Sequence, residues 1–193
     1  MLPLTNPPRV KARDTLLMIV DLQDKLLATI PDRDEILGNA AFLLDVAHQL
    51  HVATMATEQA PEKLGDTTAS IAQRLRHDRI SKSCFSCCEA AGVFEKLHQA
   101  GRPNIVLVGV ETHVCIAQTA LDLLGQGFRP WLAIDAIGSR HEMDHHVAID
   151  RLEKAGAIVT TSEALAFEWL GDAAHPHFKE VSTLIKQRNQ GTA

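Results

Sequence analysis

Short, unbroken apolar runs that alternate with helical patterns constrain this fold more than any other feature of the sequence. Two of these runs, TLLMIVD at 15–21 and NIVLVGV at 104–110, contain almost no polar residues. Runs of this kind suit strands that are covered on both faces, as in a parallel sheet. A segment with helical spacing of its apolar residues follows the first run at 34–50. The pattern therefore indicates a sheet between layers of helices.

The same alternation continues to the end of the chain. Further strands are expected at 51–58, 78–83, 129–136 and 157–161, and further helices at 67–76, 88–100, 112–127, 139–156, 162–170 and 177–188. Six strands that alternate with helices predict a doubly wound, Rossmann-like α/β fold, in which a parallel six-stranded sheet carries helices on both faces. The 193 residues contain no linker or internal repeat, so we expect one domain over 1–193 with a core at about 14–188.

Charge and cysteine content exclude several classes of function. The formal net charge of −5 leaves no basic surplus to neutralise phosphates, so we expect no nucleic-acid partner. No apolar run approaches the ~20 residues that cross a bilayer, and the first residues lack the apolar core of a signal peptide. Four cysteines are too few and too clustered for a disulfide framework: Cys84, Cys87, Cys88 and Cys115. We expect no membrane association and a cytoplasmic location, with an organelle left open.

Polar side chains stand where three of the predicted strands end. Asp21 ends the first strand, Lys82 ends the third, and Cys115 follows the fourth after a short turn. Ligands of such sheets bind outside the carboxyl ends of the strands, so the three side chains meet there if their strands are parallel neighbours. A helix N-terminus and a nearby lysine both favour the thiolate of a cysteine. An aspartate within reach could take the thiol proton and later pass it to a leaving group.

Each of these residues also has a purely structural interpretation. Cys115 could be a small core residue beside an apolar helix face, Asp21 could cap a turn, and Lys82 could be solvated. Their joint placement at strand ends favours a catalytic site, but position alone leaves both interpretations open.

The segments that carry these residues resemble the signature segments of the isochorismatase-like cysteine hydrolases. The matching stretches are IVDLQDKL (19–26), KSCFS (82–86) and GVETHVCIAQTALDLL (109–124). Two further stretches, TEQAPEKLG (57–65) and GDAAHPHFKEVSTLIK (171–186), are similar to the isochorismatase domain-containing protein subgroup. The resemblance spans about residues 14–188 and supports the same doubly wound fold.

The resemblance implies a role for each matched residue. Cys115 matches the family's nucleophile, Asp21 its acidic proton acceptor and Lys82 its lysine. The family's non-proline cis peptide would fall between Val110 and Glu111. The backbone N–H groups of Glu111 and Cys115 would then face a developing oxyanion.

Other motifs receive structural interpretations. Nicotinamidase-type relatives carry a metal-binding Asp-x-His segment where this chain reads Thr57-Glu58-Gln59, so no metal is expected there. HEMDH (141–145) has the zincin spacing, but Ser139 and Glu142 are better interpreted as a capping box that opens a surface helix. CFSCC (84–88) lacks a second cysteine pair, which favours packing over metal binding. No glycine-rich phosphate loop is present, so no nucleotide cofactor is expected.

These observations predict a cofactor-free cysteine hydrolase with no metal. Cys115 would attack a small amide-like or related carbonyl substrate and form a thioester that water hydrolyses. The residues expected in the substrate pocket are Gln23, Glu58 and Phe85. The alternative is a non-catalytic interaction protein that keeps the fold and uses its helical surface for assembly. The resemblance favours a homo-oligomer, and the sequence does not specify the substrate.

Overall fold

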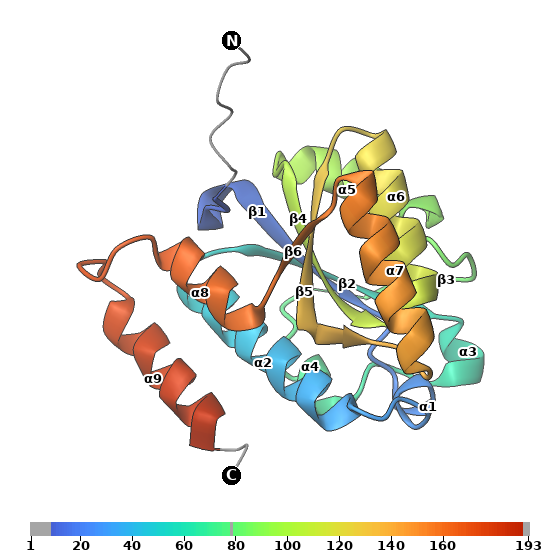
Figure 1. Ribbon diagram of the computed structural model, residues 1–193, viewed down its shortest axis with the longest axis horizontal. Helices are drawn as coiled ribbons and strands as arrows, with labels where there is room; N and C mark the ends of the chain where they lie inside the picture. The colour runs from blue at the N-terminus through green and yellow to red at the C-terminus, as the bar shows by residue number, and fades with distance from the viewer. Residues whose placement is uncertain (1–8, 78, 191–193) are drawn as a thin grey trace.

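The computed structural model describes residues 9–77 and 79–190, which form one sheet between two layers of helices (Figure 1). The strands are β1 (Thr15–Val20), β2 (Ala53–Gln59), β3 (Ile80–Lys82), β4 (Asn104–Val110), β5 (Arg129–Gly138) and β6 (Ile158–Thr160). They pair in parallel in the order β3-β2-β1-β4-β5-β6. The predicted six-stranded parallel α/β fold is confirmed. Residues 1–8, 78 and 191–193 of the predicted domain, including the ends of both tails, lie outside the described residues.

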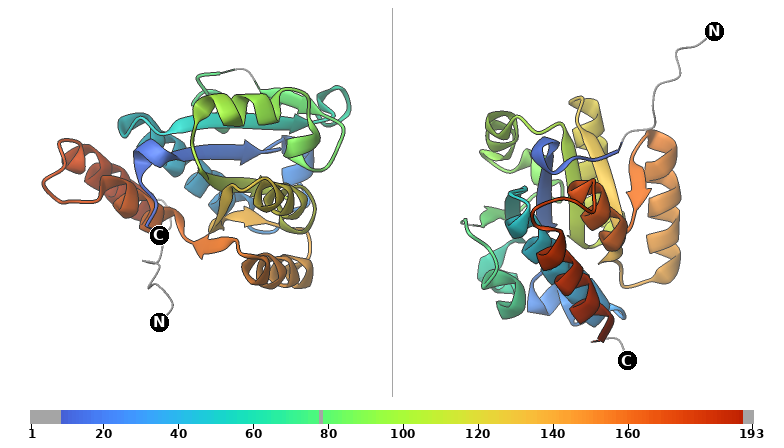
Figure 2. Two further views of the ribbon diagram at one scale, coloured as in Figure 1. Left: turned by 90° about the horizontal axis from the view of Figure 1, so that it is seen from above. Right: turned by 90° about the vertical axis from the view of Figure 1, so that its left-hand side faces the viewer.

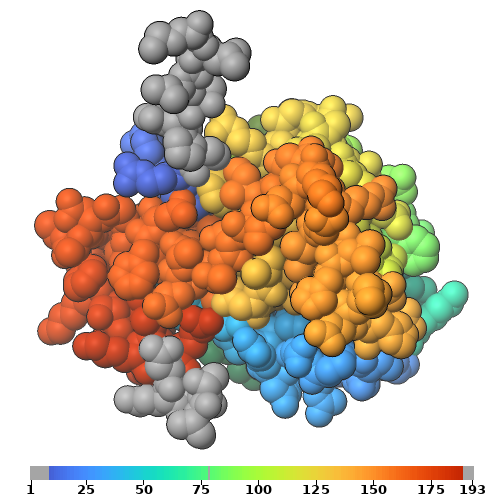
Figure 3. All heavy atoms as spheres, in the orientation of Figure 1, coloured from blue at the N-terminus to red at the C-terminus, as the bar shows by residue number. Residues whose placement is uncertain are grey.

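Helices cover both faces of this sheet. They are α1 (Asp24–Leu27), α2 (Arg33–Gln49), α3 (Pro61–Leu64), α4 (Ala69–Ala72), α5 (Val93–Ala100), α6 (Ala117–Gly125), α7 (Glu142–Ala155), α8 (Ser162–Leu170) and α9 (Phe178–Gln190). One hydrophobic core lies under α2, α8 and α9, and a second lies under α5, α6 and α7, on the two sides seen in Figure 2. In Figure 3, α8 and α9 lie together at one side of the molecule, away from α7.

The central strands β1 and β4 explain the apolar runs of the sequence. Every residue of both strands is buried. Side chains alternate between the two faces of a strand, so Leu17 and Ile19 enter the core under α2 while Met18 and Val20 enter the core under α5 and α6. Because both faces are covered, neither set of positions tolerates a polar residue. Burial of one such side chain stabilises the fold by about 1.5–3 kcal/mol.

Some predicted boundaries differ from the structure for local reasons. The capping box at Ser139 is wrong, because α7 begins at Glu142 after His141 and no side chain caps it. The Ser139 hydroxyl instead lies 3.0 Å from Nδ1 of His113. The helix expected at 88–100 begins only at Val93, because Gly92 adopts a left-handed φ of +81° after a 3₁₀ turn at Cys87–Glu89. The helix expected at 67–76 is reduced to α4.

The strand order places a crevice between the carboxyl ends of β1 and β4. The chain leaves β1 toward β2 on one side and leaves β4 toward β5 on the other, and ligands bind at such switch points. The two strands approach closely here, because Gly109 has φ +124° and a Cβ on it would collide with the carbonyl oxygen of Val20. Asp21 follows with φ +53°, a conformation that costs a non-glycine residue about 1–3 kcal/mol and concentrates at functional sites.

None of the helices in the described part of the chain combines the length and the hydropathy that a membrane span requires.

Candidate active site

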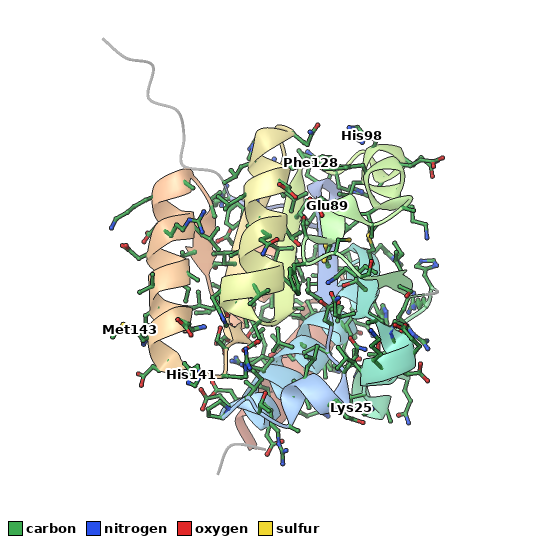
Figure 4. The ribbon with its side chains drawn as sticks, turned by 90° about the vertical axis from the view of Figure 1, so that its right-hand side faces the viewer. Lys25, Glu89, His98, Phe128, His141 and Met143 are labelled. Atoms are coloured by element: carbon green, nitrogen blue, oxygen red, sulfur yellow. The ribbon has the colours of Figure 1, made fainter. Side chains whose placement is uncertain are left out.

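The three side chains predicted at strand ends meet at the crevice between β1 and β4. Asp21 follows β1, Lys82 ends β3, and Cys115 lies in a π-helical turn, Thr112–Ile116, that links β4 to α6. Lys82 Nζ lies 2.7 Å from Asp21 Oδ2 and 3.6 Å from Cys115 Sγ. The Asp21 and Lys82 side chains are excluded from solvent, and Cys115 is only 6% exposed. In Figure 4, Lys25 of α1 and His141 before α7 lie toward this end of the molecule, and His98 and Phe128 lie at the opposite end.

Lys82 reaches the site from a strand that is not a neighbour of β1. The condition that the three strands are neighbours is not met, because β2 separates β1 from β3, yet the three side chains still meet. In the register of the sheet, Val20 lies beside Thr57 and Gln59 lies beside Lys82. The long side chain of Lys82 spans the distance across β2 to Asp21, which a shorter basic side chain at the same position would not reach.

The Lys82 ammonium is fully surrounded by acceptors. Besides Asp21, it donates to Oε1 of Gln59 at 2.6 Å and to the carbonyl oxygens of Cys84 and Phe85 at 3.3 and 3.2 Å. Burial is the largest single effect and lowers the pKa of Lys82, but the Asp21 carboxylate and the neighbouring Cys87 and Cys115 together outweigh it, and the net pKa lies above its ordinary value. The residue is therefore a fixed positive charge beside the thiol.

The Asp21 carboxylate is held by a second residue that sequence reasoning missed. Thr57 Oγ1 donates to Asp21 Oδ1 at 2.8 Å, and the Asp21 amide donates to the Thr57 carbonyl oxygen at 3.3 Å. Cys87 Sγ lies 3.5 Å from the same hydroxyl, so this buried thiol packs behind the ion pair. The rule that ligands bind outside the carboxyl ends of the strands (the strand-end rule) could have identified Thr57. This residue of β2 lies beside the end of β1.

Cys115 is held as a thiol, in contrast to the expectation of a favoured thiolate. Burial raises its pKa, the adjacent Asp21 carboxylate raises it further, and the opposing effect of Lys82 leaves the pKa at about 12. The local turn also differs from an ordinary helix start, because the Ile116 amide donates to the Glu111 carbonyl oxygen at 3.2 Å and forms a π-helical turn. Such turns are frequent at functional sites. The carboxylate adjacent to this thiol is that of Asp21.

A cavity of about 290 Å³ opens beside the thiol. Its lining residues are Leu26, Gln59, Ala60, Lys63, Leu64, Phe85, Val110, Glu111, Val114 and Cys115. Phe85, predicted for the pocket, is among them and is 54% exposed. The peptide bond between Val110 and Glu111, on the cavity wall, is cis. Gln23 and Glu58, also predicted for the pocket, are not among its lining residues.

Gln23 supports the cavity wall from behind. Its Nε2 donates to the carbonyl oxygens of Gln59 and Gly65 at 3.0 and 2.5 Å, and its Oε1 accepts from the Gln59 amide at 2.7 Å. These bonds fix both ends of the segment that carries α3. The three hydrogen bonds of this side chain all go to backbone groups, so Gln23 positions the cavity wall.

Glu58 has a similar supporting position. Its Oε1 accepts from the amide and the hydroxyl of Thr67, both at 2.7 Å, and from Arg79 Nε at 3.0 Å. Burial raises the pKa of Glu58, but these hydrogen bonds and the Arg79 charge outweigh it and leave the pKa below its ordinary value. The carboxylate thus anchors the loop after α3.

The turn that carries Cys115 is braced by the segment before α7. Glu111 Oε2 accepts from the amide and from Nε of Arg140 at 2.9 and 3.0 Å. His145, one of the histidines of HEMDH, lies with Nδ1 2.9 Å from the Thr112 hydroxyl. Across residues 9–77 and 79–190, no group of three or more His, Cys, Asp or Glu side chains is arranged to hold a metal ion.

The fold is that of the isochorismatase-like hydrolases. Residues 15–164 match the family model described as the isochorismatase domain, and the chain belongs to this family. It is 42% identical over 183 residues to isochorismatase domain-containing protein 2 of Bos taurus, with 93% of this chain and 86% of that protein covered.

Two solved structures extend the comparison. The structure described as MAR1 ribonuclease from Caenorhabditis elegans has a TM-score of 0.88 and 37% identity, with 93% of each chain covered. The YcaC gene product of Escherichia coli, described as an octameric hydrolase of unknown specificity, has a TM-score of 0.82 and 25% identity, with 96% of this chain and 99% of that chain covered. Family and fold together support a hydrolase.

Proposed function

We propose that this protein is a cysteine hydrolase that cleaves a small amide or related carbonyl compound through a thioester on Cys115. One observation carries the proposal: the buried Lys82 ammonium contacts both the Asp21 carboxylate and the Cys115 thiol, at 2.7 and 3.6 Å, beside a cavity of about 290 Å³. A merely structural cysteine needs neither a buried ion pair beside it nor access to a cavity.

The first half of the reaction transfers the acyl group to sulfur. As Sγ attacks the carbonyl carbon, Asp21 accepts the thiol proton, and the new S–C bond places negative charge on the carbonyl oxygen. The backbone N–H groups of Glu111 and Cys115 would hold this oxyanion. Collapse of the tetrahedral species breaks the C–N bond, the amine leaves with the proton from Asp21, and a thioester remains.

The second half releases the acid. Asp21, again a carboxylate, accepts a proton from water as the water oxygen attacks the thioester carbon. Collapse breaks the S–C bond, the proton returns to sulfur, and the carboxylic acid departs. Lys82 is the buried counter-charge of the Asp21 carboxylate, 2.7 Å from it, and holds the carboxylate in place between these steps. No cofactor takes part in this scheme.

RNA cleavage, suggested by the description of the nematode relative, has less support in this chain. A polyanionic substrate requires several cations, whereas Lys63 is the one basic residue among those lining the cavity in the described part of the chain. The net charge of −5 also disfavours binding of a polyanion such as RNA. RNA is therefore best used as a comparison substrate.

The oligomeric state is inferred from a relative, and the cellular compartment from the state of the cysteines. We propose a homo-oligomer by analogy with the octameric relative. The four cysteines are free thiols, which supports a reducing compartment such as the cytoplasm.

Screening of small amides, esters and RNA with purified protein tests the function directly. Cys115→Ala should reduce kcat by on the order of 10⁴-fold or more, by analogy with other nucleophile deletions. Adding Asp21→Asn should cost little further activity, because the two residues act in one event. Wild-type activity of Cys115→Ala would assign the cysteine to packing. Absence of turnover by the wild-type protein on every substrate would favour the non-catalytic interaction protein.

A further inference from the structure

The cavity at Cys115 combines apolar walls with one basic residue. We infer that its substrate is a short apolar carbonyl compound that carries a carboxylate at its far end, with Lys63 as the residue that recognises this carboxylate. The inference rests on the proposed function in that the carbonyl group is placed at Cys115.

The walls favour an apolar substituent. Four different segments supply aliphatic or aromatic surface: α1 through Leu26, α3 through Leu64, the π-helical turn through Val114, and the segment after β3 through Phe85. A polar group placed against such walls would lose its hydration without gaining hydrogen bonds, which costs at least about 1–3 kcal/mol. A volume of about 290 Å³ holds about ten non-hydrogen atoms at about 30 Å³ each.

The other polar lining residues are already engaged. Gln59 accepts from Lys82 through Oε1 and donates from Nε2 to the Ser83 carbonyl oxygen at 2.9 Å. The Glu111 carboxylate accepts two bonds from Arg140. A ligand would have to break these contacts to use either side chain, so neither serves as the recognition group.

Lys63 differs from them in having an unengaged charge on a fixed backbone. Within residues 9–77 and 79–190, its ammonium has no hydrogen-bond or ion-pair partner. Its main chain is anchored, because Lys25 Nζ donates to the Lys63 carbonyl oxygen at 2.6 Å and the Ala60 amide donates to the Lys82 carbonyl oxygen at 2.8 Å. An ammonium on a fixed turn at the cavity is suited to a charge-assisted hydrogen bond with a carboxylate.

Two electrophiles of equal reactivity and different charge test this inference without requiring turnover. N-butyl bromoacetamide and bromoacetyl-β-alanine both alkylate a thiol with loss of bromide, and only the second carries a carboxylate at its far end. We expect the anionic reagent to alkylate Cys115 about three- to fivefold faster at low salt, as measured by mass mapping of the Cys115 peptide. Lys63→Met keeps the aliphatic stem and should remove this preference. Lys96→Met, on α5 and outside the cavity lining, should leave it unchanged.

Measuring amide hydrolysis as well as alkylation distinguishes a failure of this inference from a failure of the proposed function. The amide pair hexanamide and adipamic acid differs in the same way, and Lys63→Met should raise KM for adipamic acid alone. Equal alkylation by both reagents, or a preference that survives Lys63→Met, overturns carboxylate recognition even if amides are hydrolysed. A preference that disappears in Lys63→Met supports it, even if no amide is hydrolysed and the proposed function therefore fails.

Discussion

Asp21 and Lys82 form an ion pair whose two side chains are both excluded from solvent, with 2.7 Å between Oδ2 and Nζ. Removing two charges from water is costly, and the pair persists because its remaining hydrogen-bonding groups are also satisfied. Thr57 donates to the second carboxylate oxygen, and Gln59 accepts from the ammonium. The pair therefore links β1 to β3 directly beside the Cys115 thiol.

Removing one member of this pair should destabilise the protein strongly. Lys82→Met leaves the Asp21 carboxylate buried without a counter-charge, and we expect the free energy of unfolding to fall by about 3–5 kcal/mol in a denaturant titration. The double variant Asp21→Asn/Lys82→Met should regain most of this loss, because no isolated charge remains. Lys96→Met, on the exposed side of α5, is the control and should change little. Losses that simply add in the double variant would show that the two charges are not coupled.

The raised pKa of Cys115 predicts opposite effects of one variant on two rates. With a pKa of about 12, alkylation of Cys115 by a neutral reagent should rise about tenfold per pH unit through the neutral and mildly alkaline range. Asp21→Asn removes a charge that raises this pKa, so alkylation at neutral pH should become faster. Turnover should become slower in the same variant, because the proton acceptor is lost.

The dependence of the Cys115 alkylation rate on pH tests whether this thiol has a raised pKa. A plateau of the wild-type alkylation rate near neutral pH would mean that the thiolate is already formed and that Asp21 does not hold the proton in place. Cys88, whose pKa burial also raises to about 12, provides an internal reference for a buried thiol away from the cavity.

Glu58 should contribute stability and leave substrate binding unchanged. Its folded-state pKa lies below the ordinary value of 4.5, so its ionised form stabilises the fold above about that pH. This stabilisation is lost as the pH falls through the folded-state pKa. Thermal melting from acid to neutral pH should therefore show Glu58→Gln less stable than wild type at neutral pH, with the difference vanishing in strong acid. A pocket role for Glu58 would instead raise KM without this pH-dependent loss.

The sequence predicts the order of elements well because burial on both faces of β1 and β4 leaves a one-dimensional signature. The strand-end rule likewise identifies Asp21 and Cys115, which follow neighbouring strands. It identifies Lys82 only in part, since strand order depends on long-range pairing and the position of β3 at the sheet edge has no local signal. The thiol pKa could not be predicted, because it depends on the relative distances of two opposite charges in three dimensions.

The same distinction applies to the pocket. Phe85 lies between β3 and the 3₁₀ turn at Cys87–Glu89, and its side chain is exposed on the cavity wall. Gln23 and Glu58 are polar residues near strand ends, as the rule requires, yet their side chains turn toward backbone and toward Thr67. Sequence position indicates the edge of the sheet at which a polar residue lies, whereas the direction of its side chain depends on the loops that fold over it.

Gly109 should be essential for both the fold and the site, for a reason specific to its place between β4 and β1. Its φ of +124° is unfavourable for other residues, and a Cβ would collide with the Val20 carbonyl oxygen immediately before Asp21. Gly109→Ala must displace one of the two central strands, so we expect a loss of about 2 kcal/mol or more in the free energy of unfolding. Activity should fall further than stability explains, because the shift moves Asp21 away from Cys115.

Gly125→Ala in α6 is the matched control, since nothing lies within 4 Å of its added Cβ. It should be neutral or stabilise the helix by up to about 1 kcal/mol. Equal melting temperatures for the two variants would show that β1 and β4 adjust without cost, and the close approach at Val20 would then not position Asp21.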